Sequence, residues 1–108
     1  MADPADFIED IAKYTATVNE VAVARIVKHL GIALSGKDSS LVSCSDKSEL
    51  DRVRESWSKK KLGLTDDDAS LDATISSVCE QMSADRSKHR VTFYYLVAEK
   101  SGKLGDLV

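Results

Sequence analysis

The 108-residue sequence contains few residues that could crosslink the chain or bind a metal. Its two cysteines, Cys44 and Cys79, form no CxxC pair, and its two histidines, His29 and His89, fit no metal-ligand spacing such as HExxH. The sequence therefore predicts neither a disulfide nor a metal site, and it favours a reducing, cytoplasmic environment. We expect Cys79 to be a buried, inert thiol and Cys44, in a loop, to be the more accessible one.

Long apolar runs and glycine-rich loops are also missing. No window approaches the roughly 18 apolar residues that a membrane-spanning helix requires, and the acidic start, MADPADFIED, lacks the features of a secretory signal. The five glycines form no nucleotide-binding fingerprint. We therefore expect no membrane partner, no export, no cofactor and no catalytic constellation.

The composition is that of an ordinary globular domain. The chain is 43% hydrophobic and 31% charged, and it has a single proline. A chain of this length can bury a sizeable core without metal or disulfide crosslinks. We expect one helical domain over residues 1–101 and a frayed C-terminal tail over residues 102–108.

Apolar residues recur at helical spacing in five segments, which predicts an all-α, compact single-domain bundle of about five helices. Asn19, Asp46 and Thr65 are the expected N-caps of the second, third and fourth helices, and Gly63 is expected to end the third in a left-handed conformation. Asp46 and Glu49 have the spacing of a capping box. The expected helices cover approximately residues 4–15, 20–35, 46–62, 66–82 and 86–101.

Two features leave alternatives open. Gly36 is placed to end the second helix, but Gly31 could break it earlier, near Leu30. The run VTFYYLV at 91–97 has the composition of a buried strand, yet the only other strand-like stretch is SLVSC at 40–44. We therefore predict that this run is helical and lies at the centre of the bundle, with its tyrosines in the core.

A cluster of cations precedes that run. Arg86, Lys88, His89 and Arg90 lie at the start of the predicted helix, where the helix dipole disfavours positive charge. One interpretation is an internal partner, such as the aspartates at 66–68, Glu80, Asp85 or the acidic first helix. The other is an external anion held by Arg86, Lys88 and Arg90. The lysines at 59–61 and the aspartates at 66–68 need no such explanation, because each run suits the dipole of its own helix end.

Several separated motifs resemble those of a small bacterial family that is defined only as a domain of unknown function. These motifs are SCSDKSEL at 43–50, KKLGL at 60–64, LDATISSV at 71–78 and DRSKHRVTFYYL at 85–96. The resemblance implies a compact, mostly helical, soluble bacterial protein with no established activity. It assigns no role to any residue.

We predict that the protein is a non-catalytic protein-interaction or regulatory module, acting on a protein partner or through self-association. The alternative is an anion or nucleic-acid binder that uses Arg86, Lys88 and Arg90, to which the lysines at 59–61 could add. An enzyme is a third hypothesis, with Cys44 or His29 as its participants.

Overall fold

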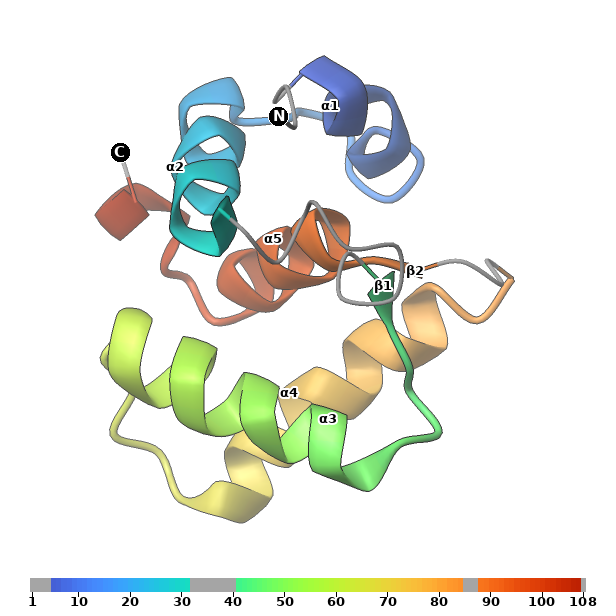
Figure 1. Ribbon diagram of the computed structural model, residues 1–108. Coiled ribbons are helices and arrows are strands. Elements are labelled where there is room, and N and C mark those ends of the chain that lie inside the picture. The colour runs from blue at the N-terminus through green and yellow to red at the C-terminus, as the bar shows by residue number, and fades with distance from the viewer. Residues whose placement is uncertain (1–4, 32–40, 85–87, 108) are drawn as a thin grey trace.

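The computed structural model describes residues 5–31, 41–84 and 88–107. Helices dominate these residues, so the predicted all-α class is confirmed (Figure 1). In chain order the elements are α1 (Ala5–Ile11), α2 (Glu20–Leu30), β1 (Leu41–Val42), α3 (Lys47–Arg52), the π-helix η2 (Val53–Lys61), α4 (Asp68–Gln81), β2 (Lys88–His89), α5 (Arg90–Lys100) and the 3-10 helix η3 (Leu104–Leu107).

Helix α5 lies at the centre of the molecule. In the view of Figure 1, α1 and α2 lie above it, and α3, η2 and α4 lie below it. Every residue from Arg90 to Ala98 is buried, which confirms the prediction of a central helix. The VTFYYLV run is apolar on all sides of the helix, so it is stable only where neighbouring elements cover its whole circumference.

Polar contacts fix the surrounding layers to α5. The indole Nε1 of Trp57 donates to the carbonyl oxygen of Tyr94 at 3.0 Å. On the other side, the hydroxyl of Tyr95 accepts a hydrogen bond of 2.9 Å from the backbone amide of Asn19. Both tyrosines belong to the core, as predicted, and their polar atoms are satisfied there.

The third helix changes its winding partway along its length. It begins as α3, with Asp46 as the predicted N-cap, and continues without interruption as η2. The wider turn of a π-helix allows residues four and five positions apart to share a face, and Val53, Trp57 and Leu62 are all buried. The predicted C-cap is confirmed, because Gly63 has φ +67° and Leu64 N donates to Ser58 O at 3.0 Å.

The boundaries of the other helices differ in part from the prediction. Asn19 caps α2 as expected, and α2 ends at Leu30, because Gly31 adopts φ +45°; of the two ends left open for this helix, the earlier one is confirmed. Helix α4 begins at Asp68 because the carboxylate of Asp67 accepts from Ser70 N, so the predicted cap at Thr65 is wrong. Helix α1 ends at Ile11, four residues earlier than expected.

A two-residue antiparallel pairing lies beside the start of α5. Leu41 is paired with His89, and Val42 with Lys88. The prediction that residues 88 and 89 are helical is therefore wrong, and α5 begins at Arg90. The strand-like stretch around residue 41 does find a partner, but that partner is the cationic cluster and not VTFYYLV.

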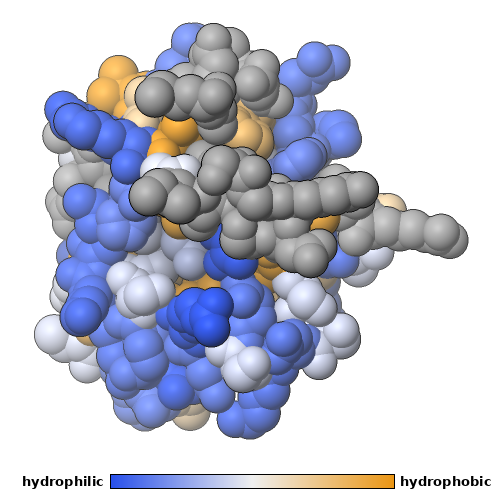
Figure 2. Space-filling view, viewed as in Figure 1, coloured by the Kyte–Doolittle hydropathy of each residue, from blue (hydrophilic) through white to orange (hydrophobic). Residues whose placement is uncertain are grey.

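The segment that we expected to fray contains η3, and Leu104 packs partly buried against the core. On the face shown in Figure 2, hydrophilic residues dominate over α3, η2 and α4, and hydrophobic residues appear mainly in the upper part. None of the helices in the described ranges is long and apolar enough to span a membrane.

Candidate functional site

The structure places Arg90, the last residue of the cationic cluster, in an internal ion pair. Its Nη1 lies 2.5 Å from the carboxylate Oε1 of Glu49, and its side chain is only 7% exposed. Its Nη2 donates to the carbonyl oxygen of Leu41 at 3.0 Å, and Nη1 also lies 3.4 Å from the hydroxyl of Tyr94. The guanidinium therefore has acceptors on two sides, contributed by three different elements.

The pKa of Arg90 reflects this environment. Burial by itself lowers the pKa of the guanidinium, but hydrogen bonds to Glu49 and Tyr94 outweigh burial and raise it above the ordinary arginine value. Glu49 was predicted to close a capping box with Asp46. Its carboxylate instead reaches Arg90, and it was not among the internal partners that the sequence suggested. The spacing from Asp46 suggested a local capping role for Glu49. Its side chain instead lies on the side of α3 that faces the core, where it reaches Arg90.

The other members of the cluster are placed differently. Lys88 is half-buried on β2 and has interaction partners of its own, and Arg86 lies outside the described residues. An anion site formed by Arg86, Lys88 and Arg90 stays a prediction.

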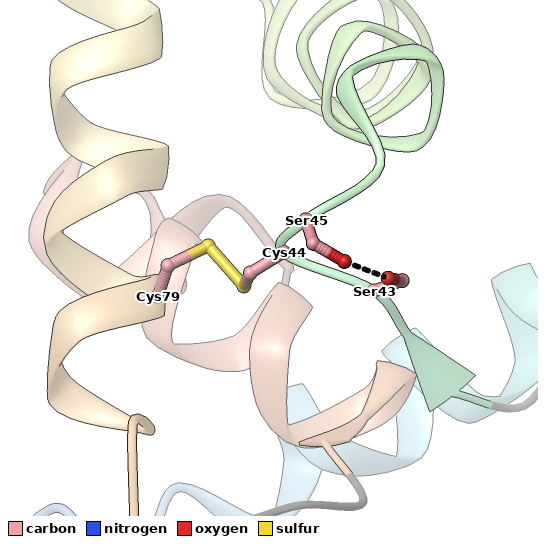
Figure 3. Close-up of a disulfide and its surroundings, with 4 residues drawn as sticks. All are labelled: Ser43, Cys44, Ser45 and Cys79. Carbon is pink, nitrogen blue, oxygen red and sulfur yellow. Dashed lines mark hydrogen bonds between the residues drawn. A yellow bond between two sulfur atoms is a disulfide. The ribbon is translucent and has the colours of Figure 1, made fainter.

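A disulfide joins Cys44, in the turn after β1, to Cys79 of α4 (Figure 3). Their Cα atoms are 5.9 Å apart, although the residues are separated by 35 positions in the sequence. The prediction of two free thiols, one inert and one accessible, is therefore wrong. Sequence motifs detect closely spaced cysteines, whereas this pair depends on how the turn after β1 packs against α4.

These contacts meet on one short stretch of chain, residues 41–49, which we call the junction segment. Its first two residues pair with β2, and the carbonyl oxygen of Leu41 accepts from Arg90. Cys44 bonds to α4, and Glu49 pairs with Arg90. The junction segment thus connects α3 to both α4 and α5, and it contains a bond that can be reduced and re-formed.

A second group of charges connects η2 to α4. Nζ of Lys59 lies 2.7 Å from the carboxylate of Asp68 and 2.9 Å from that of Glu55, and these hydrogen bonds raise the pKa of Lys59. Arg54 forms bonds of 3.0 and 3.1 Å to both carboxylate oxygens of Asp72. One lysine and one aspartate of the two charged runs therefore pair directly, in addition to any interaction with the helix dipoles.

Basic residues are exposed in the last turns of α2 and η2. Lys28 and His29 lie in the last turn of α2, and Lys60 and Lys61 lie in the last turn of η2. All four are exposed, and we call them the basic surface. The imidazole of His29 packs against Trp57, with ring centroids 5.3 Å apart. Partial burial lowers the pKa of His29, and the charge of nearby Lys61 lowers it further.

A family model described as "Protein of unknown function (DUF2853)" matches residues 6–105. The chain belongs to this family. The match extends from α1 to η3, and it confirms the resemblance that the motifs indicated. A search of curated proteins finds no match. Membership in DUF2853 supplies no role for any residue, so a function has to be inferred from the geometry.

Metal chemistry receives no support within the described ranges of this DUF2853 member. No group of three or more histidine, cysteine or carboxylate side chains there is arranged to hold a metal ion. Two arrangements remain as candidate sites, which are the junction segment with its disulfide and the basic surface. Sequence reasoning identified the lysine run of the basic surface but did not predict that Lys61 lies near enough to His29 to lower the pKa of its imidazole.

Proposed function

We propose that the protein is a non-catalytic interaction module whose basic surface binds an acidic surface on a partner protein. The observation that carries this proposal is that Lys61 of η2 lies near enough to His29 of α2 for its charge to lower the pKa of the imidazole, so the exposed lysines in the last turns of the two helices share one area of the surface. Charged patches of this kind act mainly by steering a partner and by excluding partners of the wrong charge.

The cations of the basic surface are available for a partner. Lys59, one residue earlier in the chain, is held by two carboxylates. Among the residues that the structure describes, Lys28, Lys60 and Lys61 have no carboxylate within 4 Å. Binding a carboxylate on another protein would therefore break no ion pair between these lysines and the part of the chain that the structure describes.

The basic surface rests on a rigid support. The indole of Trp57 is fully buried, and its ring contacts that of His29 at a tilt of 43°. A surface that is fixed before binding loses less conformational entropy when a partner docks. The exposed side of α2 continues this surface through Arg25 to Val21, whose 53% exposure offers an apolar contact beside the charges.

A protein partner fits the chain better than a nucleic acid does. The sequence pI is about 5.3 and the formal net charge is −3, whereas nucleic-acid-binding domains typically have a pI above about 9. The aspartates at 66–68 follow the lysine run after only four residues, and they would repel a continuous phosphate backbone.

The test uses charge reversal with a matched control. The pair Lys60→Glu and Lys61→Glu inverts the basic surface. Lys47→Glu changes the same residue type at the opposite end of the same continuous helix, where Lys47 is 89% exposed. Partners would be captured on the immobilised wild-type protein from a lysate of cells that produce it, identified by mass spectrometry and then purified.

We expect the purified partner to bind the wild-type protein and the Lys47→Glu variant with similar affinity in calorimetry. We expect the double variant to lose about tenfold or more in affinity, and wild-type binding to weaken as salt rises. Equal affinity of all three proteins would contradict the proposal. Salt-sensitive capture of RNA or DNA in place of a protein would favour the nucleic-acid alternative.

A further inference from the structure

We propose that the Cys44–Cys79 bond is a site of reversible thiol–disulfide exchange, which a dithiol reductant opens while the helical fold remains intact. The structure assigns this role on three grounds, which are the position of the bond, the redundancy of the contacts around it and the location of the core. The inference does not depend on the basic surface.

The bond lies outside the fully buried core. Cys44 and Cys79 are both only partly buried, and they pack at the margin of the core. In Figure 3 the two sulfur atoms bridge the turn after β1 and one side of α4. Thiol–disulfide exchange requires an incoming thiolate to contact a sulfur atom, so a bond at the margin reacts where one in the core would be protected.

The junction segment has further attachments that involve neither sulfur. Leu41 and Glu49, at its two ends, both bind the guanidinium of Arg90. Asp46 caps α3 through hydrogen bonds to the amides of Ser48 and Glu49. Opening the disulfide therefore releases the turn between these anchors and leaves both ends of the segment in place.

The core is organised around α5 and not around the disulfide. The fully buried side chains include Trp57, Phe93 and Tyr95, and neither cysteine is among them. A chain of 108 residues can bury enough apolar surface to fold without a crosslink. We therefore expect the reduced protein to keep its helices.

The chemistry balances with a dithiol as the co-reactant. One thiolate of the dithiol attacks a sulfur of the protein and forms a mixed disulfide, and the other protein sulfur leaves as a thiolate that takes up a proton. The second thiol of the reductant then closes its own disulfide and releases the remaining protein thiol. Two electrons and two protons pass from the dithiol to Cys44 and Cys79, and an oxidised dithiol reverses the reaction.

Opening the bond should loosen the turn after β1 and α4 near Cys79, and should leave α5 unchanged. The turn contains a contact of 3.1 Å between the hydroxyl oxygens of Ser43 and Ser45, beside the disulfide (Figure 3). Reduction removes the covalent bond that joins this turn to α4. The backbone amides of the turn and of α4 near Cys79 should therefore open more often. Amides of α5 keep their environment, because α5 packs against both layers.

The experiment follows the native, oxidised protein in buffers with varied ratios of reduced to oxidised dithiothreitol. Free thiols are counted by maleimide gel shift, helix content is followed by circular dichroism, and local opening is followed by hydrogen exchange. We expect two thiols per chain to appear and disappear reversibly, with helix content unchanged. We expect exchange to rise about tenfold at residues 43–46 and near residue 79, and to stay constant in α5.

Two results would overturn the proposal. A bond that resists dithiothreitol until urea unfolds the chain would be a purely structural crosslink. A reduced wild-type protein that loses its helices would show that the fold requires the bond. The double variant Cys44→Ser, Cys79→Ser should reproduce the exchange pattern of the reduced protein without any reductant, and if it does not fold, the reduced wild-type protein still decides the question.

Discussion

Arg90 and Glu49 form a buried ion pair that joins the first residue of the central helix to α3. Their side chains are 7% and 13% exposed, and the atoms that face each other are 2.5 Å apart. The pair explains how a cation is tolerated at the start of α5, where the dipole opposes it. A buried pair of this kind contributes less to net stability than its geometry suggests, because both ions lose their hydration, but removing one partner leaves an uncompensated charge.

The first prediction concerns this pair. Glu49→Gln should lower the free energy of unfolding by about 3 kcal/mol, because the guanidinium of Arg90 would stay buried without a counter-charge. The double variant Glu49→Leu, Arg90→Met should lose less than the single variant, since it removes both charges. Urea denaturation at pH 7 measures both values. A single variant as stable as wild type would show that the pair is not buried in solution.

The second prediction concerns the disulfide. Cys44→Ser with Cys79→Ser should lower the free energy of unfolding by roughly 3 to 4 kcal/mol, because the bond closes a 35-residue separation and restricts the unfolded chain. Domains of this size are typically stable by roughly 5 to 15 kcal/mol, so the variant should remain folded. Thermal unfolding of the variant and of the reduced and oxidised wild-type protein would check this. The reduced protein and the variant should agree.

The third prediction concerns the pH response of His29. Its folded pKa lies below the unfolded value of 6.5, so the unfolded chain binds more protons between the two pKa values. The free energy of unfolding should therefore decrease as the pH falls below about 6.5. Because the ring packs on Trp57, protonation of His29 should quench the fluorescence of the single tryptophan, with a midpoint below 6.5.

Two variants decide the origin of this response. His29→Gln should abolish the fluorescence transition, and Lys61→Gln should move its midpoint to higher pH, because the repelling charge is removed. An unchanged midpoint in Lys61→Gln would show that the charge of Lys61 does not act on His29. The ends of α2 and η2 would then not share one surface, and the proposed basic surface would be contradicted.

The fourth prediction concerns Asp46, the N-cap of α3. A hydrogen bond from the Ser48 hydroxyl, followed by one from the Glu49 amide, lowers the pKa of the Asp46 carboxylate below its usual value. A depressed pKa contributes stability above the unfolded pKa that is lost as pH falls through the folded pKa. Asp46→Asn keeps a good cap but cannot titrate. At pH 7 we expect the Asp46→Asn variant and the wild-type protein to have equal free energies of unfolding. Between about pH 5 and pH 2 the free energy of unfolding should fall less in the variant than in the wild type, as measured by urea denaturation.

The helices could be predicted from the sequence because their signals are local. Asn19 and Asp46 cap the helices that follow them, and Gly63 ends one, since each acts on amides or backbone angles within a few residues. The burial of VTFYYLV followed from its composition. Helix ends were less certain. The cap predicted at Thr65 was wrong, because Asp67 makes the same kind of signal, and of the two ends left open for α2 the structure shows the earlier one, at Gly31.

The candidate sites were harder to predict because they connect distant parts of the chain. Glu49 has a plausible local role beside Asp46, and only packing shows that its carboxylate reaches Arg90. The cysteines have no local spacing to mark them. The π-helical winding of η2, which turns Leu62 toward the core, has no signal in the periodicity of an ordinary helix.

The sequence by itself determined the class of fold, the central position of the aromatic segment and several helix caps, because these follow from composition and from interactions within a turn or two. Tertiary structure alone decided the partner of Arg90, the bonding of Cys44 to Cys79 and the meeting of His29 with Lys61. Those contacts depend on how helices pack against one another, and electrostatic and covalent bonds form between whichever groups that packing brings within reach.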